Sequence, residues 1–184
     1  RHAFNLPHDK QLVLFGAFGG TEDPRKGFTY LRDTLHALSE SSDIELVVFG
    51  SDHPEDLDVN LPVHQIGRLQ DSVSMVLLCS ACDVFALPSL QDNLPNTLLE
   101  SLACGTPCVA FDTGGIADII QHQQNGYLAR FKDTQDLAQG IQWTLTQSLL
   151  AEDIHQQTVD RYNLPHIAQQ YTQLYQSLIN KTHI

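Results

Sequence analysis

Short apolar runs that alternate with helical patterns are the feature that most restricts the fold of this chain. Six runs are predicted to be strands: Gln11–Gly16, Ile44–Gly50, Val63–Gly67, Asp83–Pro88, Cys108–Phe111 and Tyr127–Phe131. They are mostly continuous apolar blocks, which favours strands buried on both faces of a parallel sheet. Repeated strand, crossover and strand units predict one α/β domain: a doubly wound, Rossmann-like parallel sheet of about six strands.

Helices are expected between these strands and after the last one. The predicted segments are Arg25–Ser39, Asp71–Ala81, Asn96–Ala103 and Ile116–Gln121, followed by a helical remainder that breaks at Asn163–Pro165. The last helix, about residues 164–184, places Tyr171, Leu174 and Leu178 on one face. We expect that face to pack on a domain outside this chain.

Length and charge exclude several classes of protein. The 184 residues suffice for one domain with a proper core. A formal charge of −12 with only 10 Lys and Arg argues against a nucleic-acid binder, which would present a broad basic face. No apolar stretch approaches the ~20 residues of a membrane span.

The four cysteines permit a zinc site, a redox pair or plain structural thiols. Cys79 and Cys82 fall at the end of a predicted helix, and Cys108 opens a predicted strand. Those are positions for small buried side chains. A helix C-terminus also raises the pKa of a thiol, whereas a reactive thiolate needs it lowered. We therefore expect structural cysteines, no metal site and a reducing, cytoplasmic location.

Ligands of such sheets bind beyond the carboxyl ends of the strands, and three segments there carry unusual chemistry. The first begins at Gly16 and ends with Arg25 and Lys26, at the start of a predicted helix. Cations conflict with the dipole of a helix N-terminus unless an anion joins them, so the pair indicates phosphate. The alternative is two solvated cations beside Glu22 and Asp23.

The other two segments follow the fourth and the third strand. Asp92 lies in a loop and Glu100 in the apolar helix that the loop feeds, so both carboxylates could reach one ligand. They could equally be a turn residue and a solvent-facing residue. In the segment 65–69, Gly67 would let the backbone approach a flat base.

Together these segments resemble family-4 glycosyltransferases, which have the GT-B architecture. The family pattern appears here as Pro88-Ser89, then Asp92, seven residues, Glu100, and Ala103-Cys-Gly-Thr-Pro107. Val109–Gly115 and Arg25–Gly27 also match, and the resemblance extends from about Gln11 to Leu178.

The resemblance implies a role for each matching position. Glu100 would bind the ribose, Asp92 the hydroxyls of the donor sugar, and Lys26 with Arg25 the diphosphate leaving group. Lys26, Arg25 and Asp92 would thus be the catalytic residues. The positions implied in binding the nucleotide sugar are Gly16, Lys26, Ile66, Arg68, Leu69, Asp92, Asn93, Leu94, Pro95, Asn96, Thr97 and Glu100.

The resemblance also implies an activity. A hexose-type sugar would pass from a UDP- or GDP-sugar to an acceptor with retention, without metal or cofactor, in polysaccharide, lipopolysaccharide or glycolipid synthesis. The chain would be the donor-binding, C-terminal half, and the acceptor would lie on an absent N-terminal domain. This half alone would bind nucleotide weakly and transfer nothing. We expect no nucleic-acid partner, and a peripheral membrane association through the absent domain.

Two departures from the family pattern leave alternatives open. Asp92-Asn93-Leu94-Pro95 stands where the family commonly has Glu-Gly-Phe-Gly, and Ala17 stands where many relatives have Arg. A catalytically inactive nucleotide-binding module would fit these departures. A nucleotide-sugar epimerase of the same architecture is the third hypothesis.

Overall fold

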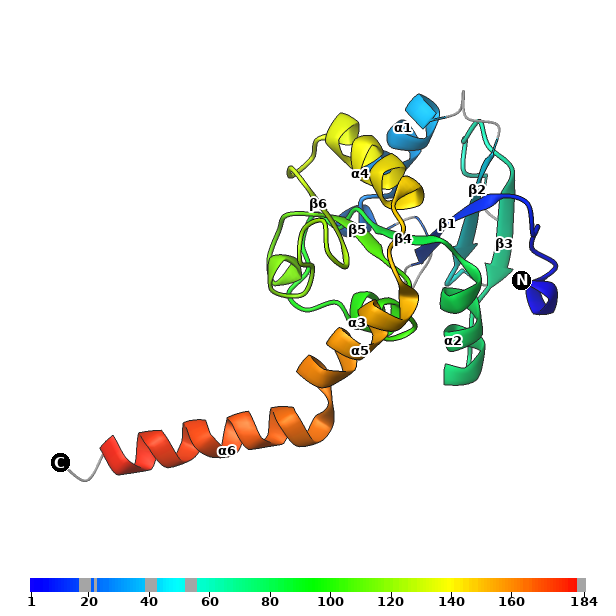
Figure 1. Cartoon of the computed structure of the whole chain (residues 1–184). Coiled ribbons are helices and arrows are strands. Elements are labelled where there is room, and N and C mark those ends of the chain that lie inside the picture. Colours follow the sequence, from blue (N-terminus) through cyan, green and yellow to red (C-terminus); the bar gives the residue numbers. More distant parts are fainter. Residues whose placement is uncertain (17–20, 22, 39–42, 52–55, 182–184) are drawn as a thin grey trace.

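The computed structural model describes residues 1–16, 21, 23–38, 43–51 and 56–181. Its centre is one parallel sheet of six strands (Figure 1). The strands are β1 (Gln11–Gly16), β2 (Ile44–Phe49), β3 (Val63–Gly67), β4 (Val84–Leu87), β5 (Cys108–Phe111) and β6 (Gly126–Ala129). Their order across the sheet is β3-β2-β1-β4-β5-β6. The order reverses between β1 and β4, which confirms the doubly wound α/β fold.

Helices cover both faces of the sheet (Figure 1). One face packs against α1 (Phe28–Leu38) and α4 (Thr134–Thr146). The other packs against α2 (Ser72–Ala81), α3 (Asn96–Ala103) and α5 (Ala151–Tyr162). Alternate residues of each strand serve the two cores, because successive side chains point to opposite faces. The central strands β1, β4 and β5 are therefore buried on both sides, as their apolar runs predict, whereas the edge strand β3 is only half-buried.

Hydrogen bonding in a local turn makes α1 begin later than the sequence pattern predicts. The prediction that a helix begins at Arg25 is wrong: Pro24–Lys26 forms a separate 3₁₀ turn, and α1 begins at Phe28. The Asp23 carboxylate caps the turn by accepting the Arg25 backbone N–H, and Gly27 ends it at φ 68°. Glycine adopts this left-handed conformation without strain. Arg25 and Lys26 therefore lie in a connection between β1 and α1.

Smaller differences occur after β5. The helix predicted for Ile116–Gln121 is a 3₁₀ turn at Ile116–Asp118, and β6 begins at Gly126 and ends at Ala129. The helical remainder breaks at residues 147–150 as well as at the predicted Asn163. There the Asn163 side chain accepts the His166 backbone N–H at 2.9 Å and caps the last helix.

The last helix, α6 (Leu164–Lys181), extends away from the body of the domain (Figure 1). Its large apolar side chains are exposed, including Tyr171 (56%), Leu174 (51%) and Leu178 (52%), the residues predicted to share one face. Every helix among the described residues is too short or too polar to cross a membrane.

A buried carboxylate joins β6 to α4. Asp136 accepts hydrogen bonds from the Tyr127 hydroxyl at 2.9 Å and from the Arg130 backbone N–H at 2.7 Å. The Arg130 guanidinium adds a third bond at 3.1 Å. Burial raises the pKa of Asp136, but these hydrogen bonds outweigh burial and hold the pKa below its ordinary value of 3.8.

We predict that Asp136→Asn removes part of the acid sensitivity of the fold. A carboxyl group with a depressed pKa stabilises the folded state above its unfolded pKa, and this stabilisation is lost as pH falls through the folded pKa. Wild-type protein should therefore lose more free energy of unfolding than Asp136→Asn between about pH 5 and pH 2, measured by denaturant titration. Asp43→Asn, which removes an exposed carboxylate, is the control. Equal losses in wild type and Asp136→Asn would contradict the assignment.

Candidate functional site

An ion pair joins two loops at the carboxyl edge of the sheet. Lys26 lies in the connection after β1, and Asp92 lies in the loop between β4 and α3. Lys26 Nζ donates to Asp92 Oδ2 at 3.0 Å. The two side chains are only 28% and 16% exposed. The structure thus brings together two predicted site residues that are far apart in the sequence.

Backbone contacts hold the two loops against each other. The Leu90 N–H donates to the Arg25 carbonyl at 2.7 Å. A Cβ on Gly27 would lie 1.9 Å from the Pro88 carbonyl oxygen, so only glycine permits this approach. The turn that carries Lys26 is therefore seated directly on the loop that carries Asp92.

A glycine pair after β5 supports the same loop from the other side. A Cβ on Gly114 would lie 1.9 Å from the Asp92 carbonyl oxygen, and one on Gly115 would lie 2.1 Å from that of Asn93. The backbone of three connections thus meets around Asp92. This packing explains why the sequence carries Gly114-Gly115 at a strand end.

A cavity of about 470 Å³ opens at the ion pair, and we call it the Lys26 cavity. It is lined by Arg25, Lys26, Gln91, Asp92 and Asn93. Arg25 is 70% exposed and forms an ion pair with Asp23 at 2.8 Å. Hydrogen bonds from Arg25 hold the pKa of Asp23 below its ordinary value. The Lys26 side chain is 28% exposed, so it is more enclosed than that of Arg25. Gln91 is the one lining residue that was not predicted from the sequence, because it belongs to no recognisable motif.

A second cavity at this edge, of about 790 Å³, contains Glu100, and we call it the Glu100 cavity. Four predicted residues meet there: Arg68 and Leu69 after β3, and Thr97 and Glu100 on α3. The lining residues that sequence reasoning missed are Phe49, Gly50, Gln70, Asp71, Ser72 and Met75. Phe49 ends β2 at this edge, so strand position could have indicated it. The wall combines an aromatic ring, a thioether and a carboxylate.

The remaining predicted residues line neither of these two cavities. Ile66 is partly buried and packs against the core on the α2, α3 and α5 side of the sheet. Gly16 leaves space for the Phe49 ring, because a Cβ at this position would lie 2.0 Å from a ring carbon of Phe49. Pro95 is buried and precedes α3 without a side-chain cap, whereas Leu94 and Asn96 are exposed. Ala17 lies outside the described residues.

Three of the four cysteines are buried, and among the described residues none of the four belongs to a metal-binding cluster. Within the ranges that the structure describes, no group of three His, Cys, Asp or Glu side chains could hold a metal ion. Cys79, Cys82 and Cys108 are buried, and Cys104 is half-buried.

Comparison with known proteins identifies the family. Residues 9–147 match the family described as glycosyl transferases group 1, and the chain belongs to it. The uncharacterized glycosyltransferase MJ1607 of Methanocaldococcus jannaschii is 26% identical over 186 residues. That match covers 95% of this chain and 47% of the relative.

Solved structures show the same architecture. Sucrose-phosphate synthase from Thermosynechococcus elongatus is 25% identical, with a TM-score of 0.77 over 98% of this chain and 48% of that chain. The fold is also that of HepE from Anabaena, solved with UDP and glucose, at 22% identity and a TM-score of 0.69 over 92% of this chain and 49% of that one. The sheet and helices thus match GT-B glycosyltransferase structures, and the chain spans about half the length of these proteins.

We predict that Gly114→Ala displaces the loop around Asp92. The new methyl group would overlap the Asp92 carbonyl, and φ of 54° is unfavourable for alanine. Stability should fall by about 1–3 kcal/mol, and the amide NMR signals of Leu90, Asp92 and Asn93 should shift.

The control is Gly105→Ala at the opposite edge of the sheet. Its φ is 80°, and its Cβ would lie 2.6 Å from the Ala151 carbonyl oxygen. This variant should lose similar stability while the amide signals of Asp92 and Asn93 stay in place. Unchanged signals at those two residues in Gly114→Ala would show that the glycine does not support the loop.

Proposed function

We propose that this domain binds the nucleotide-diphosphate sugar of a hexosyltransferase across the Lys26 and Glu100 cavities. One observation carries the proposal. A single structural unit, α3 with the loop before it, contributes Asp92 to the first cavity and Glu100 to the second. The unit can therefore contact both ends of one elongated ligand. HepE, whose fold this chain shares, was solved with a nucleotide and a sugar.

The nucleoside would occupy the Glu100 cavity. The Glu100 carboxylate accepts hydrogen bonds and suits the two ribose hydroxyls. Arg68 and Leu69, with Ile66 behind them, would flank the base. The apolar surfaces of Phe49 and Met75 line the same cavity and would exclude water from the base. UDP and GDP are the nucleotides that we expect.

The diphosphate and the sugar would occupy the Lys26 cavity. In the structure the Lys26 charge is balanced by Asp92 at 3.0 Å. An entering diphosphate would take over Lys26 and leave Asp92 to accept hydrogen bonds from sugar hydroxyls. The backbone N–H groups of Asn93, Leu94 and Asn96, at the positive end of α3, would face the distal phosphate and the sugar.

Transfer would then depend on electrostatic stabilisation of the leaving group. Cleavage of the sugar–phosphate bond leaves negative charge on the diphosphate, and a fixed cation lowers the barrier by binding that charge. Lys26 would supply this cation, with Arg25 beside it, so that the reaction needs no metal. The family resemblance supports retention of the anomeric configuration.

The acceptor would bind a domain outside this chain. The chain spans about half the length of its relatives. Exposed Tyr171, Leu174 and Leu178 on α6 would pack on that second domain. The whole enzyme would act in the cytoplasm, peripherally at the inner face of the membrane, in polysaccharide, lipopolysaccharide or glycolipid synthesis.

We predict that Lys26→Ala removes most of the sugar transfer by the full-length enzyme while the fold survives. Loss of the cation should cost about 2–4 kcal/mol of transition-state stabilisation, which is roughly 30- to 1000-fold in kcat/KM. The assay follows release of UDP or GDP and formation of the glycosylated acceptor. Circular dichroism checks the fold.

Lys10→Ala is the matched control, because Lys10 pairs with Asp43 at 3.3 Å and precedes β1 at the opposite edge of the sheet. This variant should transfer sugar normally. Near-normal turnover by Lys26→Ala would refute the role of Lys26. Nucleotide binding without transfer by the wild type would favour the inactive module, and release of an altered sugar would favour the epimerase.

A further inference from the structure

A cavity of about 490 Å³ lies at the amino edge of the sheet, opposite the Lys26 and Glu100 cavities, and we call it the Trp143 cavity. The last two turns of α4 form one of its walls, and the starts of β1 and β2 form the other. Gln11 and Ile44, the first residues of these strands, are register partners. The lining residues are Gln11, Ile44, Gln139, Gln142, Trp143, Leu145 and Thr146.

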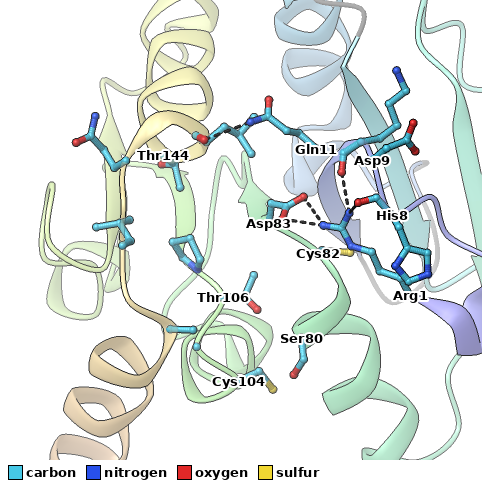
Figure 2. A pocket seen from close by; sticks show the side chains of 17 residues that line it. Arg1, His8, Asp9, Gln11, Ser80, Cys82, Asp83, Cys104, Thr106 and Thr144 are labelled. Carbon is cyan, nitrogen blue, oxygen red and sulfur yellow. Dashed lines mark hydrogen bonds and ion pairs between the residues drawn. The ribbon is translucent and has the colours of Figure 1, made fainter.

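Among the described residues, the wall of the Trp143 cavity has no charged side chain. The chain as a whole has 22 Asp and Glu and 10 Lys and Arg. The one charged residue of α4, Asp136, is buried, so the exposed side of this helix carries amides and hydroxyls instead. The neighbouring cavity at the same edge, of about 590 Å³, contains the ion pair of Arg1 and Asp83 (Figure 2). The Trp143 cavity therefore differs in charge from its surroundings.

Trp143 forms a fixed aromatic wall. Its ring packs on that of Tyr127, with the two centroids 6.0 Å apart. The Tyr127 hydroxyl donates to Asp136 at 2.9 Å, which holds the tyrosine ring in place. A Cβ on Gly140 would lie 2.5 Å from the Tyr127 ring, so this glycine lets α4 approach the ring closely. Trp143 is half-buried, so part of its surface faces the cavity.

Three polar side chains share the cavity side of α4 with Trp143. Gln139, Gln142 and Thr146 follow one another at spacings of three and four residues, and such residues are neighbours on one side of a helix. All three are exposed. On the other wall, the Gln11 amide donates to a backbone carbonyl at the end of α4 at 3.3 Å and ties the start of β1 to this helix. Three amides and a hydroxyl thus surround one aromatic ring.

We propose that the Trp143 cavity binds a neutral oligosaccharide. A side-chain amide both donates and accepts hydrogen bonds, as each sugar hydroxyl does. The apolar face of a pyranose ring can pack against the flat indole ring. A nucleotide or a phosphate would lose hydration in a site that offers no cation, so the chemistry opposes an anionic ligand. The site is independent of the proposed transfer, because its residues lie at the opposite edge of the sheet.

The fluorescence of Trp143 reports on this cavity directly, because the chain has one tryptophan. The probes are maltotriose, cellotriose and mannotriose, and inorganic phosphate is the anionic control. We expect at least one trisaccharide to change the emission with a saturable dependence on its concentration, and phosphate to leave it unchanged. An unchanged emission with all three sugars, or an equal change with phosphate, would overturn the proposal.

Glutamine variants test whether the sugar contacts α4. Gln139→Ala and Gln142→Ala should each weaken binding of the trisaccharide by about 2- to 10-fold, the contribution of one neutral hydrogen bond. Gln135→Ala is the matched control, because Gln135 is an exposed glutamine of the same helix that does not line the cavity. It should bind as the wild type does, and circular dichroism checks that all three variants are folded. Wild-type affinity in both cavity variants, or equal losses in all three, would contradict the assignment.

Discussion

The approach of Lys26 to Asp92 depends on backbone packing more than on their charges. A partly buried ion pair contributes little net stability, because the gain from attraction is offset by the loss of hydration. The Leu90 to Arg25 hydrogen bond and the close approach at Gly27 hold the two loops together. Gly114 supports the Asp92 carbonyl from a third connection. The cation is thus held in place before any ligand arrives, and such preorganisation is what a binding site for a charged group requires.

The fold could be predicted from the sequence because its strands have few alternatives. Continuous apolar runs such as Leu12–Phe15 cannot be buried on one face only, and a parallel sheet with helices on both sides satisfies them. The start of α1 could not be predicted from apolar spacing alone. Asp23, Pro24 and Gly27 decide it by local hydrogen bonding and backbone conformation.

The candidate site was predictable only where strand ends determine position. Lys26 and Asp92 follow adjacent strands of one sheet, so their meeting follows from topology. Met75 lines the Glu100 cavity because of how α2 packs over the sheet, and no local sequence pattern predicts that packing.

The central claim is that a nucleotide diphosphate bridges the Lys26 and Glu100 cavities. A crystal of this domain soaked with UDP or GDP tests it most directly. The account predicts phosphate density within about 3 Å of Lys26 Nζ, with the ribose hydroxyls bound to Glu100 and Lys26 withdrawn from Asp92. Nucleotide density elsewhere, with Lys26 still bound to Asp92 and both cavities empty, would contradict it.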